Sequence, residues 1–155
     1  PLALRYEKKL LDALSSTVAQ IVTREMLDGM RKSVPQAGKI GTVFNTHGNG
    51  DHTFGNQLVK DARIIATKGT LDDMEHRPPE QLYQMMTKNW QALGEAGRFM
   101  YEMMGSKFDF SDVVHTPPTE LFAGELKLSV GSKVVHLVEL GPAHTRGDSL
   151  AYVPA

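Results

Sequence analysis

The feature that most constrains this chain is a six-residue segment that holds two histidines and an aspartate. Its sequence, HGNGDH, occupies residues 47–52 and lies in the polar segment 45–56, which directly follows the apolar run 40–44. Imidazole and carboxylate groups are the usual ligands of zinc and similar ions. The glycines allow the backbone to curl, so that side chains close in sequence can converge on one point. This order of strand and polar turn predicts a metal site at the end of a strand, although the spacing alone also fits an ordinary solvated turn.

A second segment favours the metal interpretation. A buried-looking strand, predicted over residues 133–140, leads into the glycine-containing turn GPAHTRGD at 141–148, which carries His144. A further short strand is predicted after it, over 150–153. The chain therefore delivers histidines into two turns, each at the end of a strand.

Taken together, the two segments resemble the metallo-β-lactamase superfamily. Residues 47–52 correspond to the family's H-x-H-x-D-H motif, and residues 141–148 match its G-x-x-H-T-x-G-D motif; the resemblance covers about 36–155. It implies an α/β chain with the αβ/βα metallo-β-lactamase fold, a four-layer sandwich when complete. This chain would supply the N-terminal part, roughly one of the two sheets.

The resemblance also implies roles for the motif residues. In the family, the first two histidines of H-x-H-x-D-H and the histidine of the later motif hold one metal ion. The Asp-His pair that ends the first motif helps to hold a second. The corresponding residues here are His47, Asn49 and His144 for one ion, and Asp51 and His52 for the other. Asn49 replaces a family histidine, and a neutral carboxamide is a poorer zinc ligand than imidazole. We therefore expect one or two zinc ions, held weakly or absent; the alternative is a relic site with an intact turn and no ion.

By the same resemblance, the leading functional prediction is a metal-dependent hydrolase with a small-molecule substrate. A metal-bound hydroxide would attack an ester, thioester, lactone or amide carbonyl. Asp51 would orient the water or accept its proton, which makes it the predicted catalytic residue. The competing class is a non-catalytic binding or assembly module that keeps the scaffold and has lost the metals.

The composition excludes several other classes. The 155 residues are enough for one domain with a core, and a formal charge of −1 gives no reason to expect nucleic acid or an anionic membrane as partner. No apolar run approaches the roughly 20 residues that span a bilayer. The absence of cysteine leaves only nitrogen and oxygen ligands for a metal. The first nine residues lack the basic-then-apolar order of a signal peptide, which favours the cytoplasm.

Helical periodicity dominates the middle of the chain. Apolar residues recur at steps of three and four over 80–104, which predicts one long helix with Gly105 as its C-cap. Five of the eight methionines lie here, so the stripe is either core or an adaptable apolar wall for a substrate or partner. Together with its flanks, this stretch predicts a helical insertion at 72–113 within one incomplete domain over 1–155.

The remaining elements are read from local patterns. A helix is predicted over 23–34 with Thr23 as its N-cap, while residues 10–22 fit either a helix or a strand pair. The β-turn-α-β order after residue 40 predicts parallel strands, and Gly131-Ser132 predicts a hairpin turn. Strands are predicted over 40–45, 63–67, 125–130, 133–140 and 150–153, and a short helix over 55–60.

The resembled fold continues beyond the His144 motif. The strands over 40–44 and 133–140 are too apolar to face water on both sides, and a lone half would expose unpaired strand edges. We therefore expect either a longer polypeptide that supplies the C-terminal half or a natural truncation that pairs as a homo-oligomer.

Overall fold

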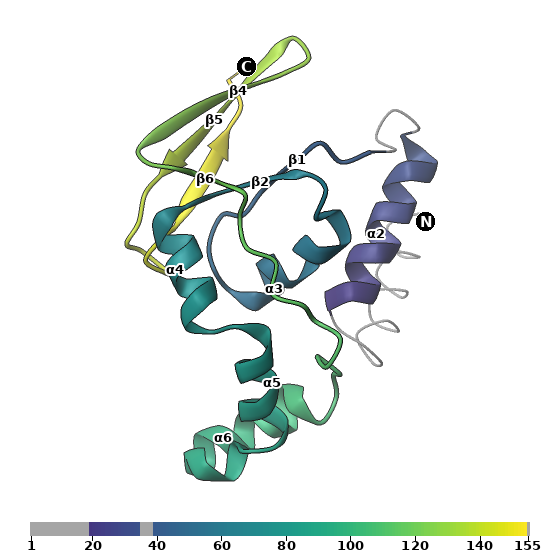
Figure 1. The fold of residues 1–155 in the computed structure, drawn as a ribbon, viewed down its shortest axis with the longest axis vertical. Coiled ribbons are helices and arrows are strands. Elements are labelled where there is room, and N and C mark those ends of the chain that lie inside the picture. Colours follow the sequence, from purple (N-terminus) through teal and green to yellow (C-terminus); the bar gives the residue numbers. More distant parts are fainter. Residues whose placement is uncertain (1–18, 35–38, 155) are drawn as a thin grey trace. The chain divides into compact units, whose positions relative to one another are not determined.

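The computed structural model of the chain describes residues 19–34 and 39–154 (Figure 1). These residues form two compact units. The helical unit combines the described residues up to 39 with residues 78–115, and the motif unit combines residues 40–77 with 116–154. Both histidine-containing turns therefore lie in one unit, the motif unit.

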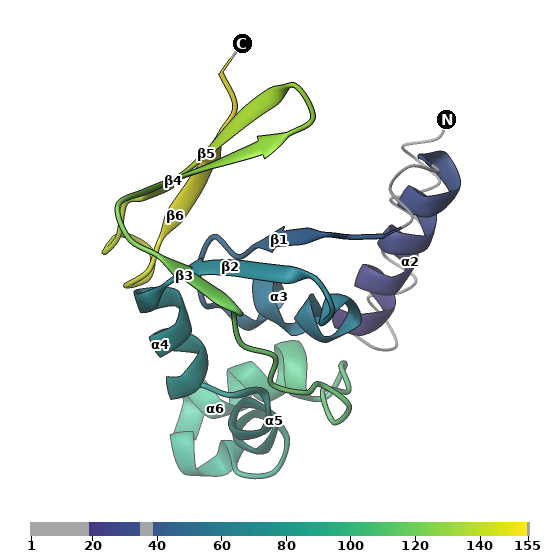
Figure 2. The same cartoon turned by 45° about the horizontal axis from the view of Figure 1, so that its top comes forward.

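The motif unit contains a three-stranded parallel sheet in the order β1-β2-β3 (Figure 2). Its central strand is the most deeply buried, because Ile64, Ile65 and Ala66 of β2 are 0% exposed. A continuous apolar run of this kind suits a parallel strand that is covered on both faces. The predicted parallel pairing is confirmed for β1 (Thr42–Phe44), β2 (Arg63–Thr67) and β3 (Glu120–Phe122).

An antiparallel sheet follows, in the order β4-β5-β6. Gly131, with φ 61°, forms the tight turn of the predicted hairpin. The prediction that the chain supplies a single sheet is wrong. Gly124 adopts φ 67° between the two sheets, a conformation that redirects the chain after β3. The strands of the second sheet are β4 (Glu125–Val130), β5 (Lys133–Glu139) and β6 (Ser149–Tyr152).

A shared apolar cluster joins these two sheets. Its buried members are Ile65 of β2, Phe122 of β3 and Leu137 of β5. Leu126 and Leu128 of β4 pack against it, as their alternation in the sequence predicts. The cluster therefore draws residues from both sheets into one core.

Short helices connect the strands of the motif unit. Between β1 and β2 lie α3 (Gly50–Thr53) and η2 (Phe54–Val59), and the latter confirms the short helix predicted over 55–60. The helix α4 (Lys68–His76) follows β2 directly. Thr67 caps it, because its hydroxyl accepts a hydrogen bond from the backbone nitrogen of Thr70 at 3.2 Å.

The helical unit holds a series of short helices where the sequence predicts one long helix over 80–104. That prediction is wrong, because the helical path is interrupted twice. Asn89, with φ −111° and ψ 12°, leaves helical geometry, and Gly94 adopts φ 59°, which glycine reaches at little cost. The observed helices are α5 (Pro79–Thr87), η3 (Trp90–Leu93), α6 (Gly94–Met100) and η4 (Tyr101–Gly105).

The first described helix is α2 (Ala19–Ser33). It confirms the helix predicted over 23–34, but Thr23 lies inside it, so the predicted N-cap is wrong. The ambiguous stretch 10–22 lies outside the described residues except for its last four, which are helical. Among the described helices, none is long and apolar enough to cross a membrane.

Candidate metal centre

The two motif turns of the motif unit each begin where a strand ends. His47 lies three residues beyond β1, and the backbone nitrogen of Asn45 still pairs with the carbonyl of Ile65 on β2 at 3.0 Å. Asp51 and His52 belong to α3. His144 lies in the loop between β5 and β6. Every predicted site residue therefore comes from a loop or short helix that the sheets hold in place.

Three imidazole rings gather between these turns. The ring centroid of His47 is 4.1 Å from that of His52 and 5.1 Å from that of His144. Asn49 joins the group, because its Nδ2 lies 2.9 Å from Nε2 of His144. The structure thus brings together His47 and His144, which are 97 positions apart in the sequence.

Asp51 stands at the solvent-facing edge of this group. Its side chain is 75% exposed, and its Oδ2 lies 3.4 Å from Nε2 of His52. His52 is also exposed, whereas His47 is half-buried. The site therefore has an open side on which carboxylate and imidazole groups meet solvent.

The two turns are linked by Thr46 and Ser149, which the sequence does not mark as site residues. The backbone carbonyl of Thr46 accepts hydrogen bonds from the backbone nitrogen of Ser149 at 2.9 Å and from its hydroxyl at 3.0 Å. The Thr46 hydroxyl lies 2.9 Å from Nδ1 of His47. Nδ1 is thereby engaged, so Nε2 is the His47 nitrogen left to serve as a ligand. No spacing rule in the sequence points to this pair, because its members are 103 positions apart.

The electrostatics of the site favour a neutral His47. Burial lowers the pKa of His47, and the positive charges that His52 and His144 carry when protonated lower it further, against the opposing effect of Asp148 and Asp51. A neutral imidazole is the form that binds metals. The environment of His47 therefore keeps its ring competent as a ligand over a wider pH range than in a free peptide.

Asp148 closes the second turn on itself. Its carboxylate accepts hydrogen bonds from the backbone nitrogen and the hydroxyl of Thr145, both at 2.8 Å. Burial acts to raise the pKa of Asp148, but these hydrogen bonds and the charge of His144 outweigh it, so the pKa lies below its ordinary value. Asp148 is therefore a charged residue that stabilises the turn.

Whether these side chains suit a metal ion depends on donor type and on convergence. Imidazole nitrogens from His47, His52 and His144, with carboxylates nearby, are the donors that zinc prefers. Convergence is incomplete: within residues 19–34 and 39–154, no three His, Cys, Asp or Glu side chains are arranged so that they could hold an ion together. Asn49 occupies Nε2 of His144, so ligation there requires this contact to open. The cluster therefore fits a metal in the chemistry of its donors but not in their convergence, and ligation by His144 would require Asn49 to turn aside.

The chain matches a known protein family over most of its length. Residues 10–155 match the sequence model of the metallo-beta-lactamase superfamily. No curated protein sequence matches the chain.

Solved structures give the same fold. A metallo-beta-lactamase from Pontibacter korlensis aligns with TM-score 0.56 at 15% identity, over 91% of this chain and 49% of that one. The inverting sec-alkylsulfatase Pisa1 from Pseudomonas sp. aligns with TM-score 0.58 at 14% identity, over 90% and 24% respectively. A metallo-beta-lactamase motif mutant from Cronobacter sakazakii aligns with TM-score 0.50 at 14% identity, over 89% and 46%.

The chain spans about half the length of the two lactamases and about a quarter of the alkylsulfatase. At these identities the alignments show the fold alone, whereas the family match covers nearly the whole sequence. The chain therefore belongs to the metallo-β-lactamase superfamily and has part of its αβ/βα fold.

Proposed function

We propose that this chain carries part of the active site of a metal-dependent hydrolase. Members of the superfamily are usually hydrolases of this kind. The observation that carries the proposal is the gathering of His47, His52 and His144. The ring centroid of His47 lies 4.1 Å from that of His52 and 5.1 Å from that of His144, although His144 comes from a distant part of the sequence. A core or a solvated turn has no need to bring three imidazoles together.

His47, His144 and the Asn49 carboxamide would hold one zinc ion, and Asp51 with His52 would help to hold a second. When bound, zinc supplies Lewis-acid polarisation of a carbonyl group and a lowered pKa for a water molecule. Because Asn49 is a weak ligand that already contacts His144, we expect fewer than two tightly bound ions per chain.

The exposed carboxylate of Asp51 is the proposed general base. It stands at the open side of the site, 3.4 Å from Nε2 of His52, where it could orient a water molecule and accept its proton. Substrates of the proposed reaction are small molecules with an ester, thioester, lactone or amide carbonyl. The scaffold does not choose among them, because one fold supports many substrates.

One observation favours a second candidate function, a metal-depleted binding or assembly module. The Asn49 amide donates to the nitrogen of His144 that a metal would need, at 2.9 Å. A site that holds itself closed in this way could keep its turn without an ion. The two candidates differ in whether purified protein binds zinc through the motif histidines.

Zinc titration of matched variants separates these candidates. We expect the wild-type chain to bind zinc and His144→Ala to lose most of this affinity, while His115→Ala, a change of an exposed histidine outside both motifs, keeps it. Hydrolysis of a panel of esters, thioesters, lactones and amides should follow the same order. Equal zinc affinity in all three proteins, or none in any, would remove the motif histidines from a metal role.

A further inference from the structure

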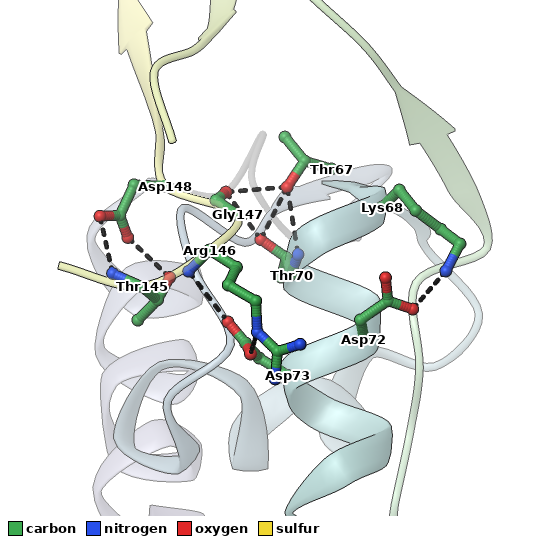
Figure 3. A network of polar contacts seen from close by, with 9 residues as sticks. All are labelled: Thr67, Lys68, Thr70, Asp72, Asp73, Thr145, Arg146, Gly147 and Asp148. Carbon is green, nitrogen blue, oxygen red and sulfur yellow. Dashed lines mark hydrogen bonds and ion pairs between the residues drawn. The ribbon is translucent and has the colours of Figure 1, made fainter. Parts of the chain in front are cut away.

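A buried carboxylate on α4 binds the turn that carries His144 (Figure 3). Asp73 has only 5% of its side chain exposed. Its Oδ1 accepts a hydrogen bond from Nε of Arg146 at 2.9 Å, and its Oδ2 accepts one from the backbone nitrogen of Arg146 at 3.2 Å. A buried carboxylate requires such partners. Asp73 therefore fixes both the backbone and the side chain of a residue two positions after His144.

Two buried hydroxyls fix the next residue of the same turn. Thr67 and Thr70, both 0% exposed, donate to the carbonyl oxygen of Gly147 at 2.8 and 3.0 Å. The backbones approach so closely that a methyl group at Gly69 would lie 2.8 Å from Cα of Gly147. The beginning of α4 thus packs closely against the turn at Gly147.

The same part of α4 supports the first motif. A methyl group at Gly48 would lie 2.7 Å from Cβ of Asp73 and 3.0 Å from the carbonyl oxygen of Thr70. The loop that carries His47 and Asn49 therefore packs on the helix surface at the residue that binds the His144 turn. Asp73 stands at the point where both histidine loops meet α4.

We propose that Asp73 is a positioning residue for the histidine cluster, and that Thr67 and Thr70 assist it by holding Gly147. The His144 ring itself is exposed, so its place beside His47 depends on how firmly the backbone of its turn is held. Hydrogen bonds one shell away from the ligands set the orientation of those ligands in metal sites. The consequence for metal binding rests on the proposed function, whereas the positioning of His144 does not.

The test compares two neighbouring carboxylates of α4. Asp73→Asn removes the charge that binds Arg146, and Asp72→Asn is the matched control, because Asp72 pairs with Lys68 on the exposed side of the helix. Arg146→Gln is a second test variant. Its side chain is 62% exposed, and the change removes the guanidinium bond to Asp73 while the backbone nitrogen of residue 146 can still donate to that carboxylate.

Two readouts apply to the full chain. The first is the NMR signals of the His144 imidazole in metal-free protein, assigned with His144→Gln. We expect these signals to shift and broaden in Asp73→Asn, to change to a smaller extent in Arg146→Gln and to stay unchanged in Asp72→Asn. The second is Co²⁺ affinity, which we expect to fall about 10–100-fold in Asp73→Asn and less than about two-fold in Asp72→Asn.

The readouts separate the two claims. His144 signals that are identical in wild type, Asp73→Asn and Arg146→Gln would overturn the positioning role, whatever the metal affinities are. If the His144 signals change in the variants but the wild-type chain binds no Co²⁺, the result would support the positioning role and count against the proposed function. If Asp73→Asn does not fold, the Arg146→Gln comparison decides: changed His144 signals support the inference, and unchanged signals overturn it.

Discussion

Asn49 determines which partner the His144 imidazole has. Its Nδ2 lies 2.9 Å from Nε2 of His144, so an amide hydrogen faces the nitrogen that would otherwise point at a metal. The sequence motif identifies Asn49 as the departure from the family pattern, but it does not show where the amide points. That orientation depends on a loop 95 positions away, and spacing within a motif carries no information about it.

We predict that Asn49→His raises zinc affinity by roughly ten-fold or more. Loss of a residue that only orients a ligand already changes metal affinity by about ten-fold, and a new ligand should have at least that effect. The substitution supplies an imidazole donor and frees Nε2 of His144. Competition with a chromophoric zinc chelator measures the effect, and Asn89→His, which adds a histidine at an exposed position of the helical unit, is the control. Unchanged affinity in Asn49→His would exclude residue 49 from the coordination shell.

His47 makes the stability of the chain depend on pH. Its pKa is lowered from 6.5 in the folded protein, chiefly by burial and then by its histidine neighbours. The unfolded chain therefore takes up this proton at a higher pH than the folded chain does. It follows that protonation of His47 favours unfolding as the pH falls below about 6.5.

We predict that His47→Gln reduces the loss of unfolding free energy between pH 7 and the region below 6.5. Urea denaturation at a series of pH values, followed by circular dichroism, measures the slope for wild type and variant. A variant whose slope equals that of wild type would show that His47 titrates alike in both states.

At the scale of elements, the strands and the long helix contrast in how well the sequence predicts them. β2, the hairpin of β4 and β5, and the short helix η2 follow from apolar runs and turn residues that act locally. The long helix predicted over 80–104 fails because its apolar spacing continues across breaks in the backbone. Gly94, with φ 59°, lies at one break, and glycine in a sequence fits both a weak helix position and a left-handed turn.

The direction in which Gly94→Ala changes stability distinguishes the observed break from a continuous helix. In the observed conformation, Gly94→Ala places a side chain at positive φ and should destabilise the chain by about 1 kcal/mol. In a continuous helix, the same change would stabilise it by roughly 0.5–1 kcal/mol. Urea unfolding measures the difference. Gly41→Ala, where a methyl group meets no atom within 4 Å, serves as the control.

At the scale of the whole molecule, the outer face of β4-β5-β6 is only partly polar. Residues paired across antiparallel strands share a face, so Val134 lies on the same face as Tyr152 and Leu150. These side chains are 42%, 56% and 40% exposed. The opposite face carries the buried cluster of Leu126, Leu128 and Leu137. The sequence predicts apolar strands here, but the strand register was needed to identify the exposed face.

We predict that a further polypeptide covers this face, and that the isolated 155-residue chain associates with itself in solution. Light scattering over a range of protein concentrations should show a mass above that of a monomer, and Val134→Lys should lower it by placing a charge on the contact. Lys133→Glu, on the opposite face of the same strand, is the control for a change of charge. A monomeric chain that unfolds cooperatively would mean that this face tolerates water.

The central claim is that the two motif turns form one metal centre, and zinc K-edge X-ray absorption of protein loaded with one equivalent of zinc tests it most directly. We predict a first shell with imidazole nitrogens at about 2.0–2.1 Å, and a loss of part of the imidazole scattering in His144→Gln. A spectrum without imidazole scattering, or one that His144→Gln leaves unchanged, would contradict the account.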